Sequence, residues 1–390
     1  MTNYVGIDVA KRKHTALVID EQSQVVVKPF NLANNQAGMA QLLGQLGALV
    51  GSVEIGLEAT GHYWLALYEQ LTAAGYTVRV LNPLQVHAYQ GTDIRKRKTD
   101  KIDAFWIADF VRISQGEPPA NKSETQLQIR ELARFRCNLV NQIGDAKRRV
   151  VGLLDRVFPE YETLFSDVFL VSSRRLLTEA VLAQEFADFD LEELSCLLKQ
   201  ASRGHFGHDK AQTIQQTARA SIGVTFLADA ARVEMSCLLE QITFLETQVA
   251  RVDETLAVLV TQLSDYQFLL SISGIGPVIA ALLLGEIGDI HRFDTLSQVV
   301  AYAGIDPVVH QSGQFQAEET KMSKRGSPYL RYALWLAAGN ARLNDPELQA
   351  YYDKRRAEGK AHGTVMGALC RKVLARVYTV LKEQRTYVIR

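Results

Sequence analysis

The sequence predicts an α/β domain at the N-terminus, then long helices, then a mainly helical C-terminal domain. Three β-branched or alternating stretches come first and regular helix and strand patterns follow, which is typical of a mixed sheet. The chain has 390 residues, enough for two or three domains. We expect an α/β domain over residues 1–120, a helical region over 121–265 and a C-terminal domain over 266–390.

The first domain opens with three expected strands within residues 3–30. The patterns that follow predict a helix over 36–50, a strand over 53–58, a helix over 62–75, a strand over 76–81 and a helix over 99–113. Pro83 is expected to end the last strand, and a polar loop over 114–123 to end the domain.

Two long helices are predicted in the middle region, over 124–158 and 227–265. Apolar residues in the second recur every three or four positions, which suits a coiled-coil seam. That seam consists of Leu238, Ile242, Leu245, Val249, Val252, Leu256 and Leu259. The two helices can pair with each other or with a second subunit.

The C-terminal region is basic. From Ile305 to Arg390 there are 15 Lys and Arg against 8 Asp and Glu, although the whole chain is neutral with 43 of each. Residues 273–288 predict a helix-hairpin-helix element, whose glycine turn can present backbone N–H groups to a phosphate. Residues 328–390 predict further helices.

Cysteine spacing and hydropathy limit the possible classes of protein. The four cysteines are far apart and form no CxxC pair, which argues against a zinc site or a disulfide framework. No signal peptide is apparent, and no apolar run is long enough to span a bilayer. We therefore expect a cytoplasmic protein without a membrane partner.

Four acidic residues form the strongest candidate site. Asp8 and Glu58 each end an expected strand, and Asp100 and Asp103 begin an expected helix on one of its faces. Such acids are individually ordinary, because helix starts favour Asp. Together they suggest a site for Mg²⁺, with Mn²⁺ as the second choice, since hard oxygen ligands suit these ions. Metal sites of this kind promote displacement at a phosphate.

A basic run precedes the last two acids and consists of Arg95, Lys96, Arg97 and Lys98. It is either a solvated surface or, as we favour, a patch that binds nucleic-acid phosphates. His62, Tyr63 and Trp64 follow Glu58; they can contact a nucleotide, although core packing suits Trp64 equally well.

Ser312 lies in a Gln-Ser-Gly loop, and a second polar turn after it carries Lys324 and Arg325, with Arg331 in the following helix. A serine near cations can act as a nucleophile towards phosphorus, while the cations stabilise charge on the phosphoryl oxygens. Ser-Gly is also an ordinary turn dipeptide, so the residues alone leave both interpretations open.

The motifs GIDVAKRKH, GLEATGHYW and KTDKIDA at one end, and AYAGIDPVVHQSG and MSKRGSPYLRYALWLAA at the other, resemble a known family. This family is the DEDD transposases of bacterial insertion sequences, the IS110 family, which includes Piv-type DNA invertases. The resemblance covers both ends of the chain in the expected order; the middle region is similar only in being helical.

The resemblance implies a RuvC/RNase H-like N-terminal domain, a coiled coil and a C-terminal transposase domain. It implies that Asp8, Glu58, Asp100 and Asp103 bind Mg²⁺ and that Ser312 forms a covalent phosphoserine intermediate with DNA. It further implies donor and target DNA as partners, a structured non-coding guide RNA called the bridge RNA, action at the nucleoid, and a homodimer or homotetramer whose subunits share an active site.

Two alternatives to this recombinase remain. The first is a metal-dependent, RuvC-like endonuclease that uses water and forms no covalent adduct. The second is a regulator that binds nucleic acid on a degenerate nuclease scaffold. The intact set of four acids argues against the second, because a degenerate site should have lost one.

Overall fold

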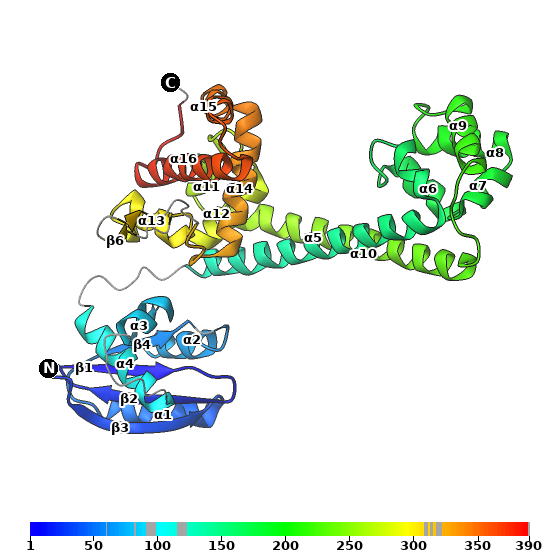
Figure 1. Ribbon diagram of the computed structural model, residues 1–390. Helices are drawn as coiled ribbons and strands as arrows, with labels where there is room; N and C mark the ends of the chain where they lie inside the picture. Colours follow the sequence, from blue (N-terminus) through cyan, green and yellow to red (C-terminus); the bar gives the residue numbers. More distant parts are fainter. Residues whose placement is uncertain are drawn as a thin grey trace. The chain divides into compact units, whose positions relative to one another are not determined.

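The computed structural model describes residues 1–59, 61–81, 83–90, 99–114, 123–307, 311–312, 315–316 and 322–388. It divides into two compact units, residues 1–123 and 124–390 (Figure 1). No helix within these described ranges is both long enough and apolar enough to cross a membrane.

The first unit contains one mixed five-stranded sheet with the order β3-β2-β1-β4-β5. Its strands are β1 (Thr2–Asp8), β2 (Lys13–Ile19), β3 (Val25–Ala33), β4 (Ser52–Glu58) and β5 (Thr77–Leu81). The first three strands pair antiparallel, whereas β4 is parallel to both β1 and β5. This confirms the expected α/β domain with a mixed sheet and agrees with an RNase H-like arrangement.

Four helices accompany the sheet: α1 (Gln36–Gly47), α2 (Leu65–Ala73), α3 (Pro83–Gln90) and α4 (Asp100–Ile113). The sequence analysis predicted three of them and missed α3. Pro83, expected only to end a strand, is the first residue of α3. Proline fits this position because the first helical N–H has no partner within the helix in any case.

The second unit is helical and is organised by two long helices, α5 (Glu124–Val157) and α10 (Ala228–Val260). They pack together within the chain (Figure 1). Arg136 of α5 pairs with Asp253 of α10 at 2.5 Å, and Arg156 pairs with Glu234 at 3.0 Å, so the helices run antiparallel. Of the two pairings that the sequence left open, the structure shows the one within the chain.

A small helical cluster occupies the end of this pair where α5 finishes and α10 begins (Figure 1). It consists of a 3₁₀ turn η1 (Pro159–Leu164) with α6 (Val171–Glu179), α7 (Ala183–Asp188), α8 (Leu191–Ala201) and α9 (His208–Arg219). Phe158, Tyr161 and Phe186 are fully buried at its centre. The cluster and the adjoining parts of α5 and α10 thus form one apolar core, separate from the core of the C-terminal helices.

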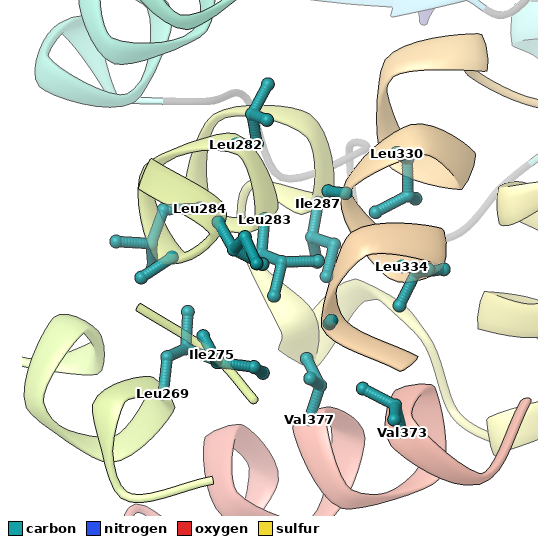
Figure 2. Close-up of a cluster of buried hydrophobic side chains, with 14 of the residues drawn as sticks. Leu269, Ile275, Leu282, Leu283, Leu284, Ile287, Leu330, Leu334, Val373 and Val377 are labelled. Atoms are coloured by element: carbon teal, nitrogen blue, oxygen red, sulfur yellow. The ribbon is translucent and has the colours of Figure 1, made fainter. Parts of the chain in front are cut away.

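The other end of the pair packs against the C-terminal helices. These are α11 (Asp265–Leu270), α12 (Pro277–Ile287), α13 (Leu296–Ala303), α14 (Pro328–Asn344), α15 (Pro346–Ala357) and α16 (His362–Lys382), with a 3₁₀ turn η2 (Ile290–Arg292) and a short hairpin of β6 (Gln311–Ser312) and β7 (Phe315–Gln316). Figure 2 shows leucines of α12 and α14 meeting valines of α16 in one apolar core.

A buried ion pair joins α5 to this C-terminal core. Arg134 Nε lies 2.5 Å from Glu286 Oε1, and Arg134 NH2 lies 2.9 Å from Oε2. The Glu286 side chain is only 2% exposed, so water does not solvate its carboxylate and the positive charge of Arg134 stabilises it instead. Because a buried carboxylate without a partner is costly, this contact fixes how α5 sits on α12.

Candidate active site

Asp8 and Glu58 end two neighbouring parallel strands. The register pairs Thr2 with Ser52 and continues without a shift to Ile7 and Leu57, so the next residues along the two strands, Asp8 and Glu58, lie at the same level. Alternating side chains put both acids on the face of the sheet that also carries Gly6 and Gly56. Both acids are half-buried.

Helix α4 lies closely against this face because the two glycines have no side chains. A Cβ added to Gly6 would lie 2.0 Å from the Ala104 carbonyl oxygen and 2.4 Å from the Ala108 nitrogen. A Cβ added to Gly56 would lie 2.5 Å from Val111 Cγ2. The sheet therefore admits the helix backbone itself at this point, as only glycine allows.

The contacts of α4 also show its direction. Arg112, near its C-terminus, donates to the Glu21 carbonyl, and the Glu21 carboxylate accepts from the Thr2 N–H at the start of β1. Ala104, nearer the N-terminus, lies over Gly6. The helix thus runs opposite to β1, and its first turn points towards the edge where Asp8 and Glu58 end their strands.

Asp100 and Asp103 occupy that first turn of α4. Thr99 caps the helix by accepting a hydrogen bond from the Ile102 N–H at 3.4 Å. Asp100 is exposed and Asp103 is half-buried, and one oxygen of Asp103 accepts from Gln90 Nε2 of α3 at 3.2 Å. The four acids predicted from sequence therefore come from elements that meet at one edge of the sheet.

Within the described ranges, no three His, Cys, Asp or Glu side chains are arranged closely enough to hold a metal ion. The chemistry of the four acids nevertheless fits a hard divalent cation, because all of them offer carboxylate oxygens. Like charges at one edge repel each other, and a cation would relieve that repulsion. The residues present thus fit such an ion chemically, without forming a closed cage for it.

A different acid of α4, Asp109, has a structural role. It accepts hydrogen bonds from Ser23 Oγ at 2.8 Å, Tyr89 OH at 2.5 Å and Arg112 Nε at 2.8 Å, and it is 6% exposed. Burial alone would raise the pKa of Asp109, but these donors outweigh it and the pKa is lowered. Burial and the bond to Asp109 raise the pKa of Tyr89 to about 12.

The turn after Asp8 is closed by His14. The Ala10 N–H donates to His14 Nδ1 at 3.2 Å, and the His14 side chain is fully buried on β2. Burial lowers the pKa of His14 more than the contact with Asn34 raises it, so the ring accepts as neutral imidazole. His14 was not recognised from the sequence, because only its burial distinguishes it from a surface histidine.

The neighbouring residues of the sequence prediction have separate outcomes. Arg95, Lys96, Arg97 and Lys98 lie outside the described residues. Trp64 is 7% exposed and contacts Tyr68 edge to face, so it belongs to the core. His62 is exposed and Tyr63 half-buried, with ring centroids 4.4 Å apart.

Ser312 lies in β6 and pairs with Phe315 of β7. Its side chain is outside what the structure describes. Backbone and side-chain contacts join the two ends of this segment. Pro307 forms a β-bridge with Met322, and the Ser323 backbone N–H and hydroxyl donate to the Asp306 carbonyl and carboxylate, respectively. The serine thus belongs to a short hairpin between α13 and α14 in the chain.

The three basic residues near this hairpin differ in exposure. Lys324 and Arg325 are exposed, and Lys324 has a left-handed φ of 53°. Arg331 is half-buried, and its NH1 donates to the Gly326 carbonyl at 2.7 Å and the Ala303 carbonyl at 3.3 Å. Arg331 therefore holds the turn together, while Lys324 and Arg325 have side chains accessible to a ligand.

The glycine turn between α11 and α12 packs against α14. Gly274 has a φ of 92°, and a Cβ added there would lie 2.6 Å from the Ala337 carbonyl oxygen. Within residues 273–288 the structure has this turn and one helix, α12, while α11 ends earlier at Leu270, so the helix-hairpin-helix element stays a prediction. The packing of the turn explains the glycine; phosphate binding by the turn stays a prediction.

Comparison with known proteins shows the family to which the chain belongs. A transposase family model of the DEDD, IS110 type matches residues 5–159, and a model described as "Transposase IS116/IS110/IS902 family" matches residues 266–353. The two matches contain all four acids and the Ser312 hairpin, respectively. The chain belongs to the IS110 family of transposases.

Individual proteins are similar to this chain along nearly its whole length. The "mini-circle putative transposase for IS117" of Streptomyces coelicolor is 25% identical over 99% of this chain and 95% of its own length. An insertion element IS900 protein of Mycobacterium paratuberculosis is 24% identical over 98% and 96%. A "pilin gene-inverting protein" of Moraxella lacunata is 23% identical over 98% and 97%. The protein is therefore an enzyme that acts on DNA.

Membership of the IS110 family also bears on the metal. A DEDD transposase implies a divalent cation, which agrees with the carboxylates at the edge of the sheet. Neither family match covers residues 160–265, which contain α6 to α9 and α10. That region was predicted to be helical, with a coiled-coil seam in its second long helix; the structure confirms the helices, and the coiled coil stays a prediction.

Proposed function

We propose that this IS110-family transposase exchanges DNA strands by joining Ser312 covalently to DNA, with Asp8, Glu58, Asp100 and Asp103 holding Mg²⁺ at the scissile phosphate. The observation that carries the metal half is the alignment of Asp8 with Glu58 at the sheet edge towards which the first turn of α4 points. Mn²⁺ would satisfy the same oxygens.

When bound, the divalent cation would supply positive charge to the phosphoryl oxygens and so stabilise the transition state. The chain's own residues position it. Gly6 and Gly56 admit α4, which carries Asp100 and Asp103 towards the edge, and His14 closes the turn that follows Asp8. Asp103, whose Oδ1 accepts from Gln90 Nε2, would still offer carboxylate oxygen to the ion.

Ser312 would form a bond from its Oγ to phosphorus while the bond from phosphorus to one deoxyribose oxygen breaks. The hydroxyl proton of Ser312 goes to the released deoxyribose oxygen, which becomes a hydroxyl. A hydroxyl of the second strand then attacks the same phosphorus and forms the new DNA phosphodiester while the bond from phosphorus to Ser312 Oγ breaks, and the proton of the attacking hydroxyl goes to Oγ. The phosphodiester energy is conserved, so strand exchange needs no external energy source.

Lys324 and Arg325 would stabilise charge on the phosphoryl oxygens, because both are exposed close to the base of the hairpin. Arg95, Lys96, Arg97 and Lys98 would contact DNA or RNA phosphates. Arg331 would contribute mainly by holding the Gly326 turn.

The direct test is a Ser312→Ala variant, assayed for recombination and for covalent protein–DNA adducts on denaturing gels. We expect both to be lost. Ser323→Ala is the matched control, because that serine lies near the base of the same hairpin with its hydroxyl bonded to Asp306. Normal adducts in Ser312→Ala would overturn the serine role. DNA cleavage by the wild type without any adduct would favour the water-using endonuclease.

A shared active site within a homodimer or homotetramer is also part of the proposal. It is tested by mixing subunits that carry Asp8→Asn with subunits that carry Ser312→Ala, each inactive alone. If acids and serine come from different subunits, mixed oligomers regain part of the activity. Mixtures that stay inactive despite forming mixed oligomers would contradict sharing.

A structured guide RNA is the last component that we propose, supported by the family resemblance and by the basic C-terminal region. Recombination should require RNA transcribed from the DNA that flanks the gene. Treatment with ribonuclease before adding DNA should abolish the activity, and adding back the transcript should restore it. Activity of RNA-free protein would exclude this component.

A further inference from the structure

A row of aromatic side chains crosses α14, α15 and the start of α16, and the proposed chemistry uses none of them. Trp335 is 40% exposed, and its ring centroid lies 6.2 Å from that of His362, edge to face. His362 in turn lies 5.8 Å from the ring of Tyr352, whose hydroxyl is 2.8 Å from His362 Nδ1. The guanidinium of Arg342 lies 4.7 Å from the Tyr352 ring centroid.

Helix α14 presents Trp335 outwards. Leu334, Ala337 and Ala338, its neighbours on the helix, are all fully buried in the C-terminal core. Trp335 therefore lies on the outer side of the helix, where Tyr332 is also 41% exposed, and it is in edge-to-face contact with His362. An exposed indole held in this way has a π-face available for another flat group.

Positive charge surrounds this aromatic row. From Asn340 to Lys372 there are seven Lys and Arg against four Asp and Glu. Lys354 and Lys360 are exposed, and the described part of the chain contains no ion pair with either of them or with Arg342. Arg342 Nε is buried and has no hydrogen-bond partner in that part.

We infer that this surface binds single-stranded DNA, with Trp335 stacking on an unpaired base and Lys354, Lys360 and Arg342 contacting the backbone. Aromatic faces next to cations are the usual means of holding single strands, since every base has a π-face. Paired bases in a duplex are already stacked and leave no face for Trp335.

This inference rests on the proposed strand exchange, because bases must leave one duplex before they pair in another, and unpaired bases are costly unless they stack elsewhere. A transposase must open a DNA duplex, so single-stranded DNA is the nucleic acid that we assign to this surface. RNA on the same surface is an outcome that the experiment distinguishes.

Intrinsic fluorescence offers a selective probe. The chain has three tryptophans, of which Trp64 is 7% exposed, Trp106 is half-buried and Trp335 is exposed. We expect oligo-dT to quench the fluorescence of the full chain and Trp335→Phe to remove most of that quenching while retaining binding. Trp335→Ala should weaken oligo-dT binding by about 5- to 150-fold, the range for one lost stacked base.

Controls separate stacking from folding and from charge. Phe244→Ala removes another aromatic, 63% exposed on α10, and should leave oligo-dT binding unchanged. Lys354→Gln with Lys360→Gln should make binding less dependent on salt concentration without abolishing the quenching. Duplex DNA of the same length should bind Trp335→Ala and the wild type equally.

The inference is overturned if Trp335→Ala binds oligo-dT as tightly as the wild type, or if it loses duplex and single-stranded binding equally. A dependence on Trp335 for oligo-U but not for oligo-dT would overturn the choice of DNA. The titration is also run in Ser312→Ala, which should bind oligo-dT normally. Failure of the serine mechanism therefore leaves this measurement intact.

Discussion

Gly6 of β1 lies directly beneath Ala104 of α4, so closely that an added Cβ would be 2.0 Å from the Ala104 carbonyl oxygen. This contact joins the strand that ends in Asp8 to the helix that begins with Asp100. The position of the two acids relative to each other therefore depends on a residue with no side chain.

Replacing Gly6 by alanine should displace α4 and weaken both stability and recombination. We expect a loss of about 2–4 kcal/mol in the free energy of unfolding, as for other overpacked or strained core positions. Thermal and denaturant unfolding measure it. Gly44→Ala in α1, where a Cβ meets nothing within 4 Å, is the control and should stabilise by about 0.5–1 kcal/mol. Equal effects of the two substitutions would contradict the close packing of α4.

The Arg134–Glu286 pair predicts a large effect far from the chemistry. Arg134→Ala removes the bidentate partner of the Glu286 carboxylate, whose side chain is 2% exposed, and leaves it with the longer contact to Arg130 Nε at 4.0 Å. We expect a loss of unfolding free energy of up to about 3–5 kcal/mol, the cost of breaking a buried pair. Adding Glu286→Gln to Arg134→Ala should recover part of it. If the double variant is no more stable than Arg134→Ala, the loss does not come from the stranded charge.

His14 predicts a specific loss of stability in acid. Burial lowers its pKa from the usual 6.5, so below pH 6.5 the unfolded chain binds a proton that the folded chain resists. The free energy of unfolding should fall as pH drops below 6.5 and should stop falling from this source once the lowered folded pKa is passed. Denaturant unfolding between pH 5 and 8 measures it, and His14→Gln should remove that part of the pH dependence. An identical pH dependence in the variant would contradict the assignment.

Much of the first unit could be predicted from sequence, because its elements follow simple periodicities. All five strands of the sheet and α4 appear where alternating or helical patterns predicted them. Short elements were not predicted. Helix α3 begins at Pro83, which was expected only to end a strand, and β6 and β7 have two residues each, too few to show a hydrophobic periodicity. The spacing of α10 predicted a seam, but only three-dimensional packing could select α5 as its partner.

The candidate site was partly predictable for a different reason. Asp100, Asp103 and Asp109 share one helix, and spacing alone cannot separate a ligand-facing acid from one enclosed by Ser23, Tyr89 and Arg112. The burial of each carboxylate separates the two roles, and the sequence alone does not show which acid is buried. The roles of His14 and Trp335 were not predicted for the same reason, since His14 is buried and Trp335 is exposed, contrary to what is usual for these residue types.

The acid quartet predicts a metal effect that can be measured without DNA. Mg²⁺ or Mn²⁺ should raise the unfolding temperature of the wild type, by an amount corresponding to about 1.4 kcal/mol at ten times the dissociation constant. Asp8→Asn should abolish the shift. Glu54→Gln changes an acid on the same face of β4 that pairs with Arg79, and should keep it. A shift of equal size in Asp8→Asn would place the ion elsewhere.

The central claim is that Ser312 becomes linked to DNA, and mapping the linked residue tests it most directly. A DNA substrate with a nick beside the cleavage site releases a short fragment on cleavage, which prevents reversal and traps the adduct. Digestion and mass spectrometry then locate the phosphodeoxynucleotide. We predict that it lies on Ser312 and forms only with a divalent cation and an intact Asp8. A nucleotide on any other residue, or cleavage with no linked peptide, would contradict the account.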